Sequence, residues 1–142
     1  MCGAANNEVA RAQQEVIEEF ALFSDWMDRY QYLIDLGRRL PELTDAERSE
    51  ENLIRGCQSQ VWFVAEQSGD RLRFRANSDA AIVSGLIALL LRIYSDKTPA
   101  DILGSSPDFV SALGLEKHLS PTRSNGLVSM LAAIRGFAEA AA

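Results

Sequence analysis

The sequence predicts an α+β fold in which a small antiparallel sheet of about three strands is flanked by helices. Three observations support this prediction. Apolar residues recur at helical spacing near both ends of the chain, their period changes to two residues between 61 and 76, and 142 residues suit one domain. We therefore expect a single domain over residues 1–142, with helices before and after the sheet in the sequence.

Two helices are expected before the sheet. The first covers Glu8 to Phe23, where the apolar residues fall on one stripe. Ser24 or Asp25 can cap the second helix, and Pro41 closes it. Residues 44–52 are polar and charged, so they predict a solvated loop with no required role in an interaction.

A β-hairpin is expected next, because the period of the apolar residues changes from helical to two. The turn signal EQSGD separates the two alternating runs, and arginines occupy the outer face of the second run. The inward positions are Val61, Phe63, Ala65, Leu72, Phe74 and Ala76, and the outer arginines are Arg71, Arg73 and Arg75. Residues 53–55 are expected to add a short leading strand, which would be the third.

Helices return after the hairpin. Residues 77–79 (Asn-Ser-Asp) supply N-caps for an apolar helix that runs to about Tyr94 and must be buried nearly all round. Thr98-Pro99 and Ser120-Pro121 each place a capping residue before a proline at the first helical position, so they mark two further helix starts. The last helix ends in an alanine-rich tail.

Composition excludes several classes of function. The formal net charge of −6 argues against nucleic acid, which favours an excess of Lys and Arg on one face. The longest apolar run, residues 80–91, is shorter than the about 20 residues that span a bilayer. The N-terminal sequence has neither the basic start nor the apolar segment of an export signal. We therefore expect a cytoplasmic protein with no membrane partner.

Cysteine and histidine are sparse: the chain has Cys2, Cys57 and His118. A zinc ion or an iron–sulfur cluster normally takes about four protein ligands, so we expect no metal site in one chain. For an arbitrary lone cysteine, a small buried hydrophobe is the preferred interpretation. A cysteine hydrolase would need His118 as its base beside Cys57. Neither residue lies in a protease signature, so this alternative ranks low.

Three features favour a reactive Cys57 over a buried one. Gly56 permits close approach of another backbone, the polar run at 58–60 (Gln-Ser-Gln) suits a loop, and Arg55 favours a thiolate. Arg123 is the second unusual residue, because the helix dipole disfavours a cation in a first turn. Capping does not explain Arg123. A helix N-terminus with an arginine attracts an anion, such as a thiolate or a partner's carboxylate.

Four stretches of the chain resemble the SufE/CsdE family of sulfur acceptors for PLP-dependent cysteine desulfurases. They are YLIDLGRRLP at 32–41, GCQSQVW at 56–62, SDAAIV at 78–83 with GL at 85–86, and HLSP at 118–121 with RS at 123–124 and GL at 126–127. They keep the family's order and cover nearly the whole domain, and GCQSQVW is the most specific. The resemblance implies the fold shared with IscU-type iron–sulfur scaffold proteins, a small antiparallel sheet flanked by helices.

The resemblance also implies roles for individual residues. Cys57 is the persulfide acceptor, and Arg123 contacts the desulfurase or stabilises an anion. Asp79 influences opening of the cysteine loop, with a plain N-cap role as the alternative. The further supporting or partner-binding positions are Gly56, Gln58 and His118. Cys2 is the one departure from the family pattern.

The function implied is a sulfur carrier with no cofactor of its own. It would take sulfur from a SufS- or CsdA-like desulfurase, stimulate that enzyme, and serve an iron–sulfur scaffold or another sulfur acceptor. Scaffolds of this fold carry three cysteines and another ligand, which this chain lacks, so a carrier is preferred. Three alternatives stay open: a CsdE-like partner of a different desulfurase, a non-covalent desulfurase-activating module, and a free-standing thiol enzyme.

Overall fold

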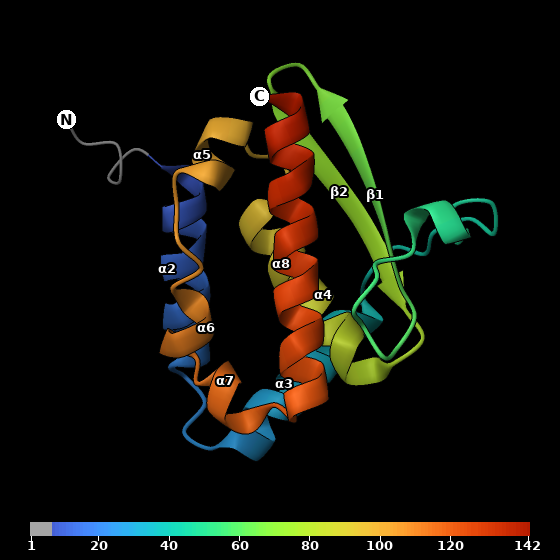
Figure 1. Cartoon of the computed structure of the whole chain (residues 1–142). Coiled ribbons are helices and arrows are strands. Elements are labelled where there is room, and N and C mark those ends of the chain that lie inside the picture. Colours follow the sequence, from blue (N-terminus) through green and yellow to red (C-terminus); the bar gives the residue numbers. More distant parts are fainter. Residues whose placement is uncertain (1–6) are drawn as a thin grey trace.

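The computed structural model describes residues 7–142 and confirms the α+β class (Figure 1). Helices α2 (Glu8–Phe20) and α3 (Trp26–Arg38) precede a short 3-10 turn, η1 (Glu50–Asn52), and the hairpin of β1 (Val61–Ser68) and β2 (Arg71–Ser78). The helices after the hairpin are α4 (Ala81–Tyr94), α5 (Pro99–Leu103), α6 (Phe109–Ala112), α7 (Leu115–His118) and α8 (Pro121–Ala141).

The hairpin has the predicted antiparallel form. Its register pairs Val61 with Ser78 and Ser68 with Arg71, and Gly69 adopts a left-handed φ of 63° in the connecting turn. The predicted third strand is wrong: within the described residues, Leu53 makes only an isolated bridge to Trp62. The chain turns at residues 55–56, immediately after this bridge, so no further pairs with β1 can form.

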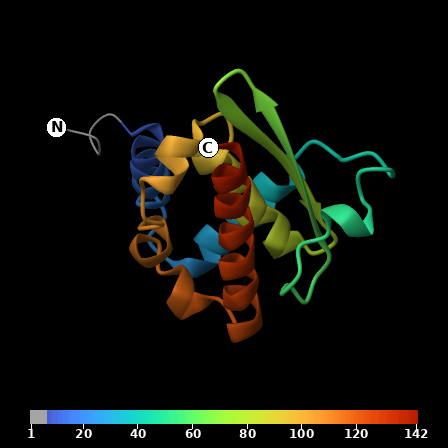
Figure 2. The same ribbon diagram turned by 45° about the horizontal axis from the view of Figure 1, so that its top comes forward.

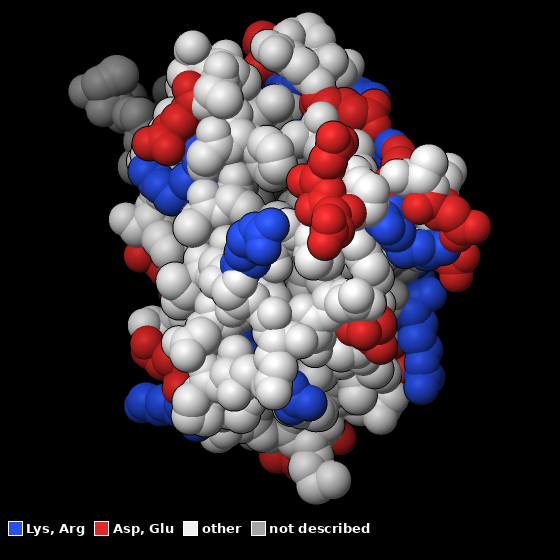
Figure 3. All heavy atoms as spheres, turned by 45° about the vertical axis from the view of Figure 1, so that its right-hand side comes forward, with Lys and Arg blue, Asp and Glu red and all other residues white. Residues whose placement is uncertain are grey.

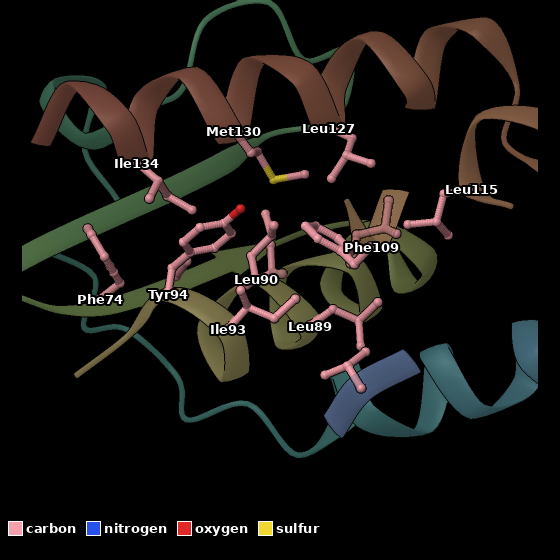
Figure 4. Packing of buried hydrophobic residues seen from close by; sticks show 14 of the residues in the cluster. Phe74, Leu89, Leu90, Ile93, Tyr94, Phe109, Leu115, Leu127, Met130 and Ile134 are labelled. Carbon is pink, nitrogen blue, oxygen red and sulfur yellow. The ribbon is translucent and has the colours of Figure 1, made fainter. Parts of the chain in front are cut away.

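Helix α4 lies in the middle of the molecule, with α3 and β2 packed against it and α8 crossing in front (Figures 1 and 2). As predicted, it is buried on nearly all sides. Figure 4 shows side chains of α8 pointing at side chains of α4, with a β2 residue beside them. These residues are Leu127, Met130 and Ile134 of α8, Leu90, Ile93 and Tyr94 of α4, and Phe74 of β2. The last helix, the central helix and the hairpin thus share one core, to which the other helices also contribute buried side chains.

Helix boundaries follow their capping residues, with two differences from the prediction. The carboxylate of Asp25 accepts from the Asp28 amide, and the hydroxyls of Thr98 and Ser120 cap α5 and α8 as expected. The first helix ends at Phe20 rather than at Phe23.

The N-cap of α4 is Ala80, which makes no side-chain cap, so the N-cap prediction for residues 77–79 is wrong. Those side chains serve the surrounding loops instead. The side chain of Asn77 bonds Leu43 N and Pro41 O, and that of Asp79 accepts from Gln60 N.

The outer arginines of β2 are paired with carboxylates. The ion pairs are Arg71 with Glu8, Arg73 with Asp96, and Arg75 with both Glu47 and Glu66. The Arg75 guanidinium lowers the pKa of Glu47 to about 2. Figure 3 shows acidic and basic side chains interspersed on the side of the molecule that carries the hairpin, without an extended basic area. This face therefore lacks the charge pattern of a nucleic-acid interface.

Among the helices within residues 7–142, none is both long and apolar enough to cross a bilayer.

Candidate functional site

Cys57 lies in the loop that joins the Leu53 bridge to β1, and its side chain packs on the backbone of α8. The thiol is half-buried and donates to the carbonyl oxygen of Gly126, with Sγ 3.6 Å from that oxygen. The approach is close but not crowded, because a Cβ on Gly126 would lie 3.6 Å from Sγ, an ordinary van der Waals contact. The cysteine is therefore held against the helix rather than extended into solvent.

Both the backbone conformation at position 56 and the space around it favour glycine. Its φ of 92° is in the left-handed region, and a Cβ at this position would overlap Oγ of Ser129 on α8. The neighbour that approaches Gly56 is thus the Ser129 side chain of the last helix, not another backbone as the sequence predicts. The contacts of Gly56 with Ser129 and of Cys57 with Gly126 place the loop directly on α8.

A cavity of about 410 Å³ opens beside the cysteine. Its lining residues are Cys57, Gln58, Ser59, Val83, Leu86, Ser120, Thr122, Arg123, Gly126 and Met130. The loop and the N-terminus of α8 supply polar groups, whereas α4 and the next turns of α8 supply apolar ones. The structure thus brings together Cys57, Gln58 and Arg123, although Arg123 lies far from the other two in the sequence.

Asp79 lies between β2 and α4, beside the end of the cysteine loop that leads into β1. Its carboxylate accepts from Gln60 N at 3.1 Å, and its own amide donates to Gln60 O at 3.4 Å. These two bonds fasten the segment between Cys57 and β1 to the start of α4. Asp79 does not line the cysteine cavity, so its contact with Cys57 is indirect.

His118 is exposed on α7 and does not line the cysteine cavity. Its ring lies edge-on to Trp26, with centroids 4.5 Å apart. Desolvation lowers the pKa of His118, and the nearby cations Arg29 and Lys117 act in the same direction. His118 borders a separate hollow of about 330 Å³, whose other lining residues are Trp26, Met27, Tyr30 and Gln31. A hydrolase base beside Cys57 is therefore missing from the described residues of this cavity.

Tyr30 is a site residue that the sequence analysis missed. Its hydroxyl accepts from Nη1 of Arg123 at 2.6 Å, although the two residues are 93 positions apart. Tyr30 falls on the apolar stripe of the second helix, and this pattern predicts only a core residue. The contact with Arg123 depends on how α3 and α8 cross, which no local pattern indicates.

Comparison with known proteins decides the family. The family model SufE, described as an Fe-S metabolism associated domain, matches residues 14–138. This chain belongs to the SufE family. An uncharacterized SufE-like protein of Rhizobium meliloti is 43% identical over 130 residues, covering 88% of this chain and 93% of the relative. Another, from Rhizobium etli, is 44% identical over 126 residues and covers 85% of each chain.

A solved structure has the same fold. The solution structure of a hypothetical protein from Thermus thermophilus matches with a TM-score of 0.76 and 22% identity, covering 92% of this chain and 95% of that chain. At that identity the likeness supports the fold alone. Both the fold class and the family resemblance predicted from the sequence are thus confirmed.

Within residues 7–142, no group of three or more His, Cys, Asp or Glu side chains is placed to hold a metal ion. Cys2 lies outside the described residues. The thiol of Cys57 lines the cavity.

The environment of Cys57 favours the protonated thiol. Burial raises the pKa of the Cys57 thiol, and donation to the Gly126 carbonyl stabilises the same form. The position of Arg55 in the sequence predicts a thiolate, but Arg55 is exposed, and burial has the dominant effect on the Cys57 pKa. Since the thiolate is the nucleophile, we expect Cys57 in this position to react slowly at neutral pH.

We expect the pH profile of Cys57 alkylation to show this protection. In a Cys2→Ser background, the folded protein should reach half-maximal rate at a higher pH than the same chain unfolded in urea. The folded state holds the thiol proton more tightly, so this contribution to stability is full below the unfolded pKa and is lost as pH rises through the folded pKa. A folded midpoint equal to or below the unfolded one would contradict the assignment.

Proposed function

We propose that this SufE family member is a sulfur carrier that accepts persulfide sulfur from a PLP-dependent cysteine desulfurase on Cys57. It stimulates that enzyme and delivers the sulfur for iron–sulfur cluster assembly in the cytosol. One observation carries the proposal. The Cys57 thiol is half-buried in a cavity that also holds Arg123 and the N-terminus of α8. This arrangement offers a nucleophile and anion-stabilising groups in one place.

The chemistry is a transfer of one sulfane sulfur between two thiols. The Cys57 thiolate attacks the terminal sulfur of the persulfide on the desulfurase, and a new S–S bond forms on Cys57. The S–S bond of the donor breaks, and its electron pair leaves on the donor cysteine as a thiolate. A proton lost from Cys57 balances the proton that the donor thiolate gains. The step has no net oxidation or reduction, so it needs no cofactor on this chain.

The partial burial of Cys57 suits a sulfur carrier and disfavours a free-standing thiol enzyme. A persulfide is readily reduced or oxidised when exposed, and the cavity shields the sulfur between transfers. The same contacts raise the pKa of Cys57, so attack requires the loop to leave Gly126. The segment that would move contains Cys57 and the exposed Gln58. It ends at Gln60, where the two hydrogen bonds to Asp79 hold the chain. We infer that docking of the desulfurase releases the loop.

The partner is a SufS- or CsdA-like desulfurase, and the downstream acceptor is an iron–sulfur scaffold or another sulfur-accepting protein. Membership of the SufE family supports a desulfurase partner in Fe–S metabolism. A CsdE-like protein would use the same cysteine chemistry with a different desulfurase. Comparing the two classes of desulfurase in one assay separates these possibilities by rate.

The proposal is tested by mass spectrometry of the full chain after incubation with a cysteine desulfurase, PLP and L-cysteine without reductant. We expect a gain of at least one sulfur atom, mapped by peptide spectra to the segment that contains Cys57. A matched reaction without L-cysteine should leave the mass unchanged. Sulfur found only on Cys2, or on neither cysteine while desulfurase turnover rises, would overturn the carrier function.

A further inference from the structure

Arg123 is the cation nearest to the chemistry, and its position is unusual. It lies in the first turn of α8, where the helix dipole disfavours a positive charge. Within residues 7–142, no carboxylate is within ion-pair distance of its guanidinium. The long side chain is also exposed, and a free arginine samples many rotamers. No ion pair among the described residues therefore orients the Arg123 guanidinium.

Tyr30 contacts Arg123 from a different helix. Its hydroxyl, on α3, accepts from Nη1 of Arg123 at 2.6 Å. Arg123 lines the cysteine cavity, whereas Tyr30 lines the neighbouring hollow beside His118. The hydrogen bond thus links a residue that lines the cysteine cavity to a residue that lines the hollow beside His118. Since guanidinium has five N–H donors, this bond leaves others free for an anion at the cysteine.

Tyr30 is itself a rigid acceptor. It is half-buried and packs against the hydrophobic core. Its ring meets Trp26 edge-on, with centroids 6.4 Å apart, and Trp26 meets His118 in the same way at 4.5 Å. A packed aromatic ring has few rotamers, so the hydroxyl is held at one point relative to α8.

We propose that Tyr30 is a positioning residue for sulfur transfer, an inference that rests on the proposed function. Its hydroxyl holds the Arg123 guanidinium at the cavity that contains Cys57. There the cation stabilises negative charge on sulfur, which passes from the Cys57 thiolate to the leaving thiolate of the donor. Without the hydroxyl, Arg123 keeps its charge but points into solvent for most of the time. Tyr30 thus contributes to sulfur transfer by orienting the Arg123 guanidinium.

Helix α3 offers a matched pair of variants for the test. Tyr30→Phe removes the hydroxyl bonded to Arg123. Tyr32→Phe removes a hydroxyl that bonds the Glu19 carboxylate, outside the lining of the cysteine cavity. Both changes delete one tyrosine hydroxyl from the same helix and one hydrogen bond to a charged side chain. Arg123→Gln gives the reference for complete loss of the cation.

The first readout needs no desulfurase. In a Cys2→Ser background, the rate of Cys57 alkylation is measured with anionic iodoacetate and with neutral iodoacetamide. The ratio of the two rates reports the local positive charge, because the thiol pKa and loop opening affect both reagents alike. We expect Tyr30→Phe to lower the ratio by about 2- to 5-fold toward the Arg123→Gln value, the range for exposed charge pairs. Tyr32→Phe should keep the wild-type ratio, and added salt should reduce the difference.

The second readout is sulfur transfer from the desulfurase. We expect Tyr30→Phe to lower the maximal transfer rate more than the apparent affinity for the enzyme. A wild-type iodoacetate preference in Tyr30→Phe, or an equal fall in Tyr32→Phe, would overturn the positioning role even if Cys57 accepts sulfur. A lowered ratio in a protein that accepts no sulfur would support the placement of Arg123 and overturn the carrier function instead.

Discussion

Replacing Cys57 with serine is expected to abolish sulfur acceptance completely while leaving the fold unchanged. A serine hydroxyl is not ionised at neutral pH and does not attack a sulfane sulfur. Its oxygen can still donate to the Gly126 carbonyl, so the loop keeps its contact with α8. Because the site is a half-buried loop, the free energy of unfolding should change by no more than about 1 kcal/mol. Mass spectra after incubation with desulfurase and L-cysteine measure the first effect, and thermal unfolding measures the second.

Cys2→Ser is the matched control, because it removes the other thiol with the same change of atoms. This variant should accept sulfur on Cys57 at the wild-type rate. Desulfurase turnover provides the further distinction between a carrier and a non-covalent activator. If Cys57→Ser stimulates the enzyme as strongly as the wild type does, the protein is an activating module and the carrier function is wrong. Loss of stimulation together with loss of acceptance is the expected result.

Local sequence patterns predicted the helices and strands whose formation depends on neighbouring residues in the chain. The two-residue alternation around Gly69 predicted the hairpin, and Thr98-Pro99 and Ser120-Pro121 predicted two helix starts. In each case the residues that form the element also carry its signal. The family motif around Cys57 likewise drew attention to the loop that borders the cavity.

The differences arise where tertiary contacts override a local preference. The turn at 55–56 lies against α8, so residues 53–55 form one bridge instead of a strand. Asp79 has a good N-cap side chain, yet its carboxylate bonds Gln60 across the loop. Arg55 suggested a thiolate at Cys57, but burial against α8 has the larger effect and the opposite sign. None of these outcomes is encoded within a short window of sequence.

The same limit applies to the pair of Tyr30 and Arg123. Each residue has a local explanation that misleads: Tyr30 belongs to an apolar helical stripe, and Arg123 follows a capping serine. Only the packing of α3 and α8 around the central helix brings hydroxyl and guanidinium together. His118 shows the converse, because it shares a family motif with Arg123 but lies beside Trp26, outside the cysteine cavity.

Replacing Gly85 with alanine is expected to destabilise the fold by about 3 kcal/mol or more. Gly85 of α4 faces α3, and a Cβ on it would lie 2.6 Å from the carbonyl carbon of Leu33 and overlap its oxygen. Gly37 of α3 is equally close, since its Cβ would lie 2.6 Å from the amide nitrogen of Gly85. These neighbours are helix backbone, so no side chain can rotate away and the two helices must separate. Urea unfolding measures the loss, and the melting temperature should fall by on the order of 10 °C.

Gly136→Ala is the control that separates overlap from helix propensity. Gly136 is exposed within α8, and a Cβ there would meet nothing within 4 Å. Alanine at this position should therefore stabilise the protein by about 0.5–1 kcal/mol. The same chemical change thus has opposite signs in the two helices. A Gly85→Ala variant as stable as the wild type would show that α3 and α4 are not packed this closely. Since Tyr30 lies on α3 and Val83 and Leu86 of α4 line the cavity, separation of these helices should also weaken the iodoacetate preference of Cys57.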